Sequence, residues 1–289
     1  MRRSGASSPG PSPARTGLTE AGRAGCARER TDFPHPGRTP KVHRRPRAET
    51  LMSDAPIAPP GLALKWLEAR AGAEALALLA RAPLLQLRAP RGRGEPVLVL
   101  PGFMADDRST FLLRRFLQRI GYHVEGWGRG RNDGRMLDHL PGTRAHLERM
   151  HADAGQPVNL VGWSRGGTLA REVARELGDR QHDLIRQVVT LGSPVRGGPA
   201  ASSIGWLAVR QTGMSLEQMN ALVAERARSP ITVPITAIYS RTDGVVAWRA
   251  SIDEQSPDVE HVEVRGSHLG LGCNAEVFGE IARRLARPR

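Results

Sequence analysis

The sequence predicts an α/β fold, in which a mostly parallel sheet carries helices on both faces. From Pro96 onward, short runs rich in Val, Ile and Leu alternate with longer segments of helical composition. The runs are apolar at nearly every position, which is typical of parallel strands buried on both faces. In addition, 39% of the 289 residues are hydrophobic and 25% are charged, so the chain can bury a sizeable core.

Six apolar runs are predicted to be strands, and most are separated by enough chain for a helical crossover. They span 97–102, 123–127, 157–163, 185–193, 234–240 and 259–266. Helices are expected over 109–120, over 137–154 with a break at Pro141–Gly142, directly after Ser164, and over 276–285. The expected apolar side of the first of these helices is Phe111, Leu112, Leu113, Phe116 and Leu117.

Two segments precede this body. Residues 1–51 are rich in Arg, Pro, Ser and Gly, and they are predicted to be a disordered tail. Met52 is a candidate for the true start of the protein, with a mis-assigned start codon explaining the tail. Residues 52–95 are predicted to be an N-terminal helical segment, helical over 61–87 with an interruption near Pro83. It is expected to pack on the body, although it could instead cover an apolar opening.

The net charge of +13 raises the question of a nucleic-acid partner. Residues 1–51 hold 11 basic and 4 acidic residues, so more than half of the excess lies in the tail. Of the 42 basic residues only Lys41 and Lys65 are lysines, which indicates a compositional bias rather than selection for phosphate contacts. The distribution therefore argues against a nucleic-acid partner.

The two cysteines, Cys26 and Cys273, are too far apart in sequence to suggest a disulfide framework or a metal site. We expect both to be free, which suits a reducing compartment. No apolar run approaches the ~20 residues of a membrane span, and Arg2 and Arg3 precede no apolar signal-peptide region. The expectation is a cytoplasmic protein that uses neither a metal nor a cofactor.

The motif GWSRGG places Ser164 between an apolar strand and a helical segment. A sharp strand-to-helix turn leaves no room for side chains two positions before and after the serine, and Gly162 and Gly166 occupy those places. Such a turn lifts the hydroxyl above the carboxyl end of the sheet, beside a helix N-terminus. We therefore predict that Ser164 is a nucleophile on a nucleophile elbow, the alternative being a glycine-rich structural turn.

A serine nucleophile needs a base and an orienting acid. His268 follows the last predicted strand in GSHLGLG, at the same sheet edge as Ser164, and is the predicted base. Asp243 follows the strand PITAIYS in the turn SRTDGVV and is the predicted acid. The chain order Ser, Asp, His is the one expected of this architecture. Asp253 and Asp258 are interpreted as turn or solvent-facing residues, and His261 as a surface residue of the last strand.

A tetrahedral intermediate also needs hydrogen-bond donors for its oxyanion. The backbone N–H of Arg165, which directly follows the serine, is one candidate. The loop PGFMADD after the first strand of the body supplies the second, and the N–H of Phe103 beside Gly102 is the best placed. The alternative for Pro101–Gly102 is an ordinary turn.

With these motifs in order, the chain from Pro96 onward resembles the α/β-hydrolase fold superfamily, and within it the small bacterial lipases and esterases. The resemblance rests on PGF, GWSRGG, VTLGSP, YSRTD and GSHLGLG. It implies that Ser164 is the nucleophile, His268 the base and then the acid, and Asp243 its partner. It also implies oxyanion donors at Phe103 and Arg165, and a glycine- and asparagine-rich loop, 128–134, beside the active site.

The sequence departs from this group in three places. Trp163 stands where many of these lipases have histidine, and Arg165 stands where they have methionine. The oxyanion loop begins with PG where HG is commoner. Finally, 195–232 is longer than a minimal lipase needs and is expected to form two short helices with an apolar face. That face would contain Trp206, Leu207, Met214, Leu216, Met219 and Leu222, and the segment is either a lid over an acyl pocket or a packed excursion.

These features predict a serine hydrolase of small, ester- or lipid-like substrates that works through an acyl-enzyme. An acyltransferase or a thioesterase would use the same residues and differ in the group that attacks the acyl-enzyme. A catalytically silent binding protein on the same fold is the alternative from another class, with nucleic-acid binding by the tail as a third.

Overall fold

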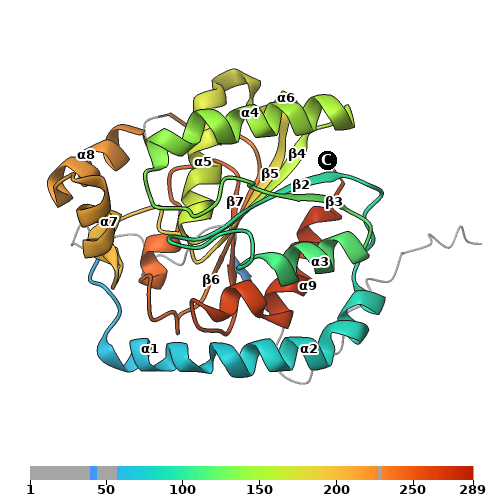
Figure 1. Cartoon of the computed structure of the whole chain (residues 1–289), viewed down its shortest axis with the longest axis horizontal. Helices are drawn as coiled ribbons and strands as arrows, with labels where there is room; N and C mark the ends of the chain where they lie inside the picture. Colours follow the sequence, from blue (N-terminus) through green and yellow to red (C-terminus); the bar gives the residue numbers. More distant parts are fainter. Residues whose placement is uncertain (1–39, 44–56, 227–228, 289) are drawn as a thin grey trace, which may run out of the picture. The chain divides into compact units, whose positions relative to one another are not determined.

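In the computed structural model, residues 40–43, 57–226 and 229–288 are described, and they build a seven-stranded sheet with helices on both faces (Figure 1). The strand order is β1-β7-β6-β5-β4-β2-β3, and every pair is parallel except β1 with β7. The six predicted strands are confirmed with small differences at their ends. They are β2 (Pro96–Leu100), β3 (His123–Gly126), β4 (Val158–Trp163), β5 (Ile185–Leu191), β6 (Ile235–Tyr239) and β7 (Val259–Glu263).

The central strands are buried on both faces because alternate side chains of each of them enter two separate hydrophobic clusters. In β2, Val97 and Val99 pack on one face, with side chains of α3 (Phe111–Arg119) and α9 (Ala275–Leu285). Leu98 and Leu100 pack on the other face, with α4 (Met136–Ala154) and α5 (Arg165–Leu177). Figure 1 shows the two groups of helices on opposite sides of the sheet. The predicted layer architecture is therefore confirmed.

Two prolines that were expected to interrupt helices do not. Pro141 lies inside α4, and Pro83 lies inside α2 (Ala71–Arg88), and both helices continue through them. Each proline removes the hydrogen bond to the carbonyl four residues earlier. In both cases the proline and that earlier residue, Leu137 or Leu79, are exposed, so water can hydrate the freed carbonyl. The expected break at Pro141–Gly142 and the interruption near Pro83 are thus wrong.

The N-terminal helical segment consists of α1 (Leu62–Trp66), a 3-10 turn over Leu67–Arg70, and α2. Its interruption is the 3-10 turn rather than Pro83. Leu78 is its one buried apolar side chain among the described residues, while Trp66 and Leu87 are largely exposed. The segment contacts α9 and the loop after β7, as expected, but most of its apolar side chains are not used in that packing.

Part of the predicted tail is ordered. Strand β1 (Lys41–His43) pairs antiparallel with β7, and Lys41 lies opposite Glu263. The main chain of an edge strand can be paired whatever its side chains, and an opposite-charge cross-strand pair adds to this. The prediction of disorder for 1–51 is therefore wrong over this strand, while 1–39 and 44–51 lie outside the described residues, as does Met52. A chain that began at Met52 would lack β1.

The remaining helices lie in two connections. A 3-10 turn (Gly178–Arg180) and the short helix α6 (Gln181–Leu184) lead from α5 into β5. Between β5 and β6 the chain forms a 3-10 turn (Gly198–Ala201), α7 (Gly205–Thr212) and α8 (Leu216–Arg226), which confirms a small helical insertion there. Short 3-10 turns follow β6 (Trp248–Ser251) and β7 (Gly270–Cys273). Within the described ranges, no helix combines the length and apolarity needed to cross a bilayer.

In helix α3, the expected apolar side is only partly correct. Leu113, Phe116 and Leu117 are buried, but Phe111 at the start of the helix is 55% exposed. Leu112 is partly buried against the cluster that contains Leu113, Phe116 and Leu117, and Phe111, the first residue of the helix, is not part of it.

Candidate active site

Ser164 occupies a sharp turn between β4 and α5. Its backbone dihedrals are φ 53° and ψ −121°, and it is one of two non-glycine residues with positive φ in the described chain. Such a conformation costs free energy and persists only where the surroundings impose it. Here its N–H donates to the Leu191 carbonyl at 2.7 Å, and its own carbonyl accepts from Gly167 at 3.0 Å. The hydroxyl is thereby held at the carboxyl end of β4.

The glycines around the serine are required by close backbone contacts. A Cβ at position 162 would collide with the backbone of Gly167, and one at 166 would collide with the Leu100 carbonyl. A Cβ at 167 would overlap the Ser193 hydroxyl. The strand and helix therefore approach each other too closely for any side chain at these positions.

The structure brings Ser164, His268 and Asp243 together. His268 Nε2 lies 3.0 Å from Ser164 Oγ, and His268 Nδ1 lies 2.6 Å from Asp243 Oδ2. All three side chains are buried. The second carboxylate oxygen of Asp243 accepts hydrogen bonds from the N–H groups of Val245 and Val246, at 2.8 and 2.7 Å. Those bonds fix the carboxylate so that Oδ2 faces the imidazole.

The charge state of His268 is set by opposing effects. Burial disfavours the imidazolium, but the charge and hydrogen bond of Asp243, with a smaller contribution from Glu68, outweigh it and raise the pKa of His268 above its ordinary value. Asp243 thus stabilises the protonated form that would appear if the imidazole accepted the Ser164 proton.

Glu68 of the N-terminal segment is a site residue that sequence reasoning missed. Its Oε1 accepts the N–H groups of Gly244 and His268, at 2.7 and 2.8 Å, and its Oε2 accepts that of Leu269 at 2.9 Å. One carboxylate therefore ties the loop that carries Asp243 to the loop that carries His268. No local sequence pattern around Glu68 predicts these hydrogen bonds, because its partners lie more than 170 residues later in the chain.

Trp163 also supports the histidine loop. Its indole Nε1 donates to the His268 carbonyl at 3.2 Å, and its ring lies against Gly272. Histidine, the residue found at this position in many of the lipases that the chain resembles, is too small to make both contacts. Tryptophan at position 163, where that group has histidine, therefore helps to hold the loop of His268 in place.

Phe103 and Arg165, the predicted oxyanion donors, line the same cavity as Ser164. Neither backbone N–H donates a hydrogen bond to another described residue, which leaves both free for a ligand oxygen. The loop that carries Phe103 is braced by Asn132, whose side chain donates to the Pro101 carbonyl at 2.9 Å and whose backbone carbonyl accepts from Met104 at 2.6 Å. The C-terminal end of the expected loop 128–134 lies beside the site, since Gly134 lines the same cavity as Ser164 and its carbonyl accepts from Arg165.

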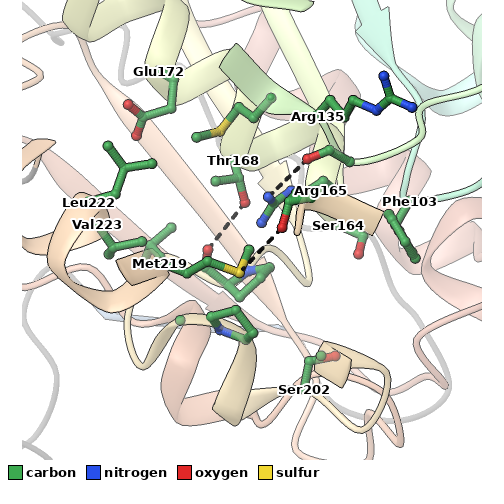
Figure 2. A pocket seen from close by; sticks show the side chains of 18 of the residues that line it. Phe103, Arg135, Ser164, Arg165, Thr168, Glu172, Ser202, Met219, Leu222 and Val223 are labelled. Atoms are coloured by element: carbon green, nitrogen blue, oxygen red, sulfur yellow. Dashed lines mark hydrogen bonds between the residues drawn. The ribbon is translucent and has the colours of Figure 1, made fainter. Parts of the chain in front are cut away.

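A cavity of about 240 Å³ opens on Ser164 (Figure 2). Phe103, Ser164 and Arg165 line one part of it, and Met219, Leu222 and Val223 of α8 line another. Of the apolar face expected in 195–232, Met214, Met219 and Leu222 line this cavity, whereas Trp206 and Leu216 are exposed and Leu207 is half-buried. Helix α7 contributes its first and last residues, Gly205 and Thr212, to the cavity wall.

Two residues, one expected at the surface and one expected at the surface or in a turn, are buried. Asp253 is 4% exposed and forms an ion pair with Arg171, at 2.6 Å between Oδ2 and Nη2. His261 is 2% exposed, and its Nε2 accepts the N–H of Asp253 at 3.0 Å. The prediction for His261 is wrong, because the connection between β6 and β7 packs against this position of β7. Asp253 is a turn residue, one of its two expected roles, since its Oδ1 accepts the N–H groups of Gln255 and Ser256, but it does not face solvent. Asp258 is exposed, as expected.

The described residues contain no cluster of three or more His, Cys, Asp or Glu side chains that could hold a metal ion. Cys273 is a free thiol, and burial, with Glu74, raises its pKa. Cys26 lies outside the described residues.

Comparison with known proteins identifies the fold of this chain. No protein-family model matches the sequence, and the search of curated proteins gives no significant match. Solved structures do match. The product of the lin2722 gene of Listeria innocua is 14% identical with a TM-score of 0.50, over 68% of this chain and 95% of that one. The mature lipase BlEst2 of Bacillus licheniformis is 13% identical with a TM-score of 0.51, over 70% and 95%.

The mouse α/β-hydrolase domain-containing protein 10 also matches, at 15% identity and a TM-score of 0.46, over 68% of this chain and 90% of that one. With the strand order and the crossovers described above, the two stronger similarities define the class: this chain has the α/β-hydrolase fold.

Proposed function

We propose that the protein is a serine hydrolase that cleaves carboxylic esters, with Ser164 as nucleophile, His268 as general base and Asp243 as the orienting acid. The observation that carries the proposal is the position of His268, which is within hydrogen-bond distance of Ser164 on one ring nitrogen and of Asp243 on the other. That geometry is the one that base-assisted nucleophilic catalysis requires.

The reaction proceeds in two stages. His268 Nε2 accepts the Ser164 proton as Oγ attacks the ester carbonyl, and the imidazolium then protonates the departing alcohol as the acyl-enzyme forms. In the second stage His268 removes a proton from water, the hydroxide attacks the acyl carbon, and the proton returns to Ser164 as the acid leaves. The N–H groups of Phe103 and Arg165 stabilise the oxyanion in both stages, at about 3–4 kcal/mol per donor.

On this proposal the body, 96–289, carries the chemistry, and 195–232 covers the acyl pocket. Support comes from the side chains of α8 that line the same cavity as Ser164. The cavity walls combine apolar and charged side chains, which fits a small ester better than a long unbranched lipid.

The test is a panel of esters hydrolysed by the wild-type protein and by Ser164→Ala. We expect turnover to fall by roughly three orders of magnitude or more in the variant. A fluorophosphonate probe should label the wild-type protein and not the variant. Added alcohols or thiols, which would divert the acyl-enzyme, distinguish a transferase from a hydrolase. Hydrolysis that survives in Ser164→Ala at a near-normal rate would refute the proposal.

A further inference from the structure

The side chain of Arg165 enters the cavity beside Ser164 without a carboxylate partner. In the view of Figure 2 its guanidinium lies between Ser164 and the apolar side chains of α8, among the residues that line the cavity. No carboxylate of the described chain comes within ion-pair distance of it. The acidic residue with the largest influence on it, Glu172, is already bound to Arg175 and, at 2.9 Å, to Arg226.

The hydrogen-bonding capacity of this guanidinium is largely unused. Arginine has five N–H donors. Within the described residues, Arg165 donates from Nη2 to the Gly134 carbonyl at 3.2 Å, and its Nε is buried without an acceptor. Burial lowers the pKa of the guanidinium, against the attraction of Glu172. Arg165 is half-buried with its Nε fully buried, and a largely desolvated cation without a counter-charge is costly, so the arrangement favours a ligand that supplies one.

The other arginines of the cavity are paired. Five arginines and two carboxylates line it, and carboxylates just outside the lining, Asp253 and Asp133, pair with two of those arginines. Arg171 is bound to Asp253, Arg175 and Arg226 are bound to Glu172, and Arg135 lies 3.4 Å from Asp133. In the described part of the cavity wall, Arg165 is therefore the cation that remains free to bind substrate.

We propose that Arg165 binds a carboxylate of the substrate, so that the preferred substrates are esters that carry a second, free carboxyl group, such as half-esters of dicarboxylic acids. This inference rests on the proposed ester hydrolysis and names its substrate class. The planar guanidinium can hold a carboxylate through two parallel hydrogen bonds. The apolar side chains of Leu222 and Val223 on the same cavity wall suit the alkyl chain between the two carbonyl groups.

The experiment compares kcat/KM for monoethyl adipate and for ethyl hexanoate, two esters of equal acyl length, by titrating the acid released. We expect the wild-type protein to prefer the half-ester by about 10- to 100-fold, the range of a hydrogen-bonded charge pair. Arg165→Met should abolish this preference. Arg165→Lys, which keeps the charge but not the planar fork, should keep part of it.

Arg135→Met is the matched control, because it removes a cation from the same cavity that already has a carboxylate partner. It should change the ratio by less than about threefold. Loss of the preference in Arg135→Met to the same extent as in Arg165→Met would overturn the assignment, since the effect would then be one of general positive charge.

Failure of this inference differs from failure of the proposed function. If ethyl hexanoate is hydrolysed in a Ser164-dependent manner and the half-ester is not preferred, or Arg165→Met keeps the preference, only the role of Arg165 is refuted. If no ester is cleaved and the fluorophosphonate probe does not react, the proposed function fails. If Arg165→Met does not fold, the test uses the wild-type protein alone. Adipate, which carries a carboxylate, should then slow its labelling by the fluorophosphonate probe more than the neutral hexanamide does. Equal protection by the two compounds, or none, overturns the inference.

Discussion

The backbone N–H of His268 donates to Glu68 Oε1 at 2.8 Å, across 200 residues of sequence. The same oxygen accepts the N–H of Gly244, which directly follows Asp243. The N-terminal segment is thus a structural part of the candidate site rather than an appendage. Because hydrogen bonds to a charged acceptor are stronger than neutral ones, this carboxylate holds the two loops at a fixed separation.

Replacing Glu68 should impair catalysis without removing any group that touches substrate. Glu68→Ala leaves three N–H groups without their acceptor, so the loops of Asp243 and His268 lose their common anchor. We expect kcat to fall by about 10- to 100-fold with a smaller change in KM, since misplacement of reacting groups affects the chemical step. Steady-state kinetics on a neutral ester measure this.

The variant Glu68→Gln distinguishes the hydrogen-bonding role of Glu68 from the role of its negative charge. Its amide oxygen can still accept one or two of the N–H groups, so it should recover part of the activity lost in Glu68→Ala. As a control, Glu176→Ala removes a surface carboxylate that contacts Arg226 and should leave kcat within about twofold. A Glu68→Ala enzyme with the wild-type kcat would show that the loops keep their positions without this anchor.

The pH dependence of the reaction should follow His268. The imidazole must be neutral to accept the Ser164 proton, so kcat/KM falls as pH drops through the His268 pKa. That pKa is raised by Asp243 and Glu68 against the effect of burial, so the acid limb should lie above the ordinary value of about 6.5. Glu68→Gln removes one of the raising charges, and its acid limb should therefore move to lower pH. An unmoved limb would indicate that the titrating group is not His268 or does not sense Glu68.

The buried Arg171–Asp253 pair should contribute to stability in a pH-dependent manner. Burial opposes ionisation of Asp253, but Arg171 and local hydrogen bonds lower its pKa to about 2. A depressed pKa means that the stabilisation is present above the unfolded value of about 4 and is lost as pH falls toward 2. At neutral pH, Asp253→Asn should cost about 3 kcal/mol, because it leaves the Arg171 charge buried and unpaired.

Denaturant unfolding of the wild-type protein and Asp253→Asn at several pH values checks this. The difference in unfolding free energy should shrink steadily below pH ~4. Asp258→Asn, in the same connection but exposed, should change stability by less than about 0.5 kcal/mol. A pH-independent difference for Asp253→Asn would contradict the electrostatic explanation.

A methyl group at position 162 should disrupt the turn at Ser164. In Gly162→Ala the new Cβ would collide with the backbone of Gly167, and neither strand nor helix can move without losing sheet or core contacts. We expect a destabilisation of about 1–3 kcal/mol and loss of fluorophosphonate labelling. Gly72→Ala is the control, since a Cβ there meets nothing within 4 Å and lies in helix α2, where alanine is favoured. Normal labelling of Gly162→Ala would show that the turn tolerates a side chain.

Much of the fold followed from local pattern alone. The apolar runs of β2 to β7, the glycines beside Ser164, and the loop positions of Asp243 and His268 at one sheet edge are visible in the sequence, because each depends on a few adjacent residues. Three other features are not visible in the sequence, because they depend on which surface each segment packs against. They are the strand order, the antiparallel edge strand β1, and the continuity of the helices through Pro83 and Pro141.

The sequence by itself therefore determined the class of fold and the candidates for the serine, histidine and aspartate. Only the tertiary structure decided which polar partners the side chains meet. It brings Glu68 to the backbone of His268, 200 residues later, buries Asp253 against Arg171, and leaves Arg165 in the cavity without a carboxylate partner. The physical reason is that hydrogen bonds and ion pairs between distant segments depend on distances of a few ångströms. Hydrophobic periodicity specifies which side of an element is buried, but it carries no information about the polar partner that the buried side will meet.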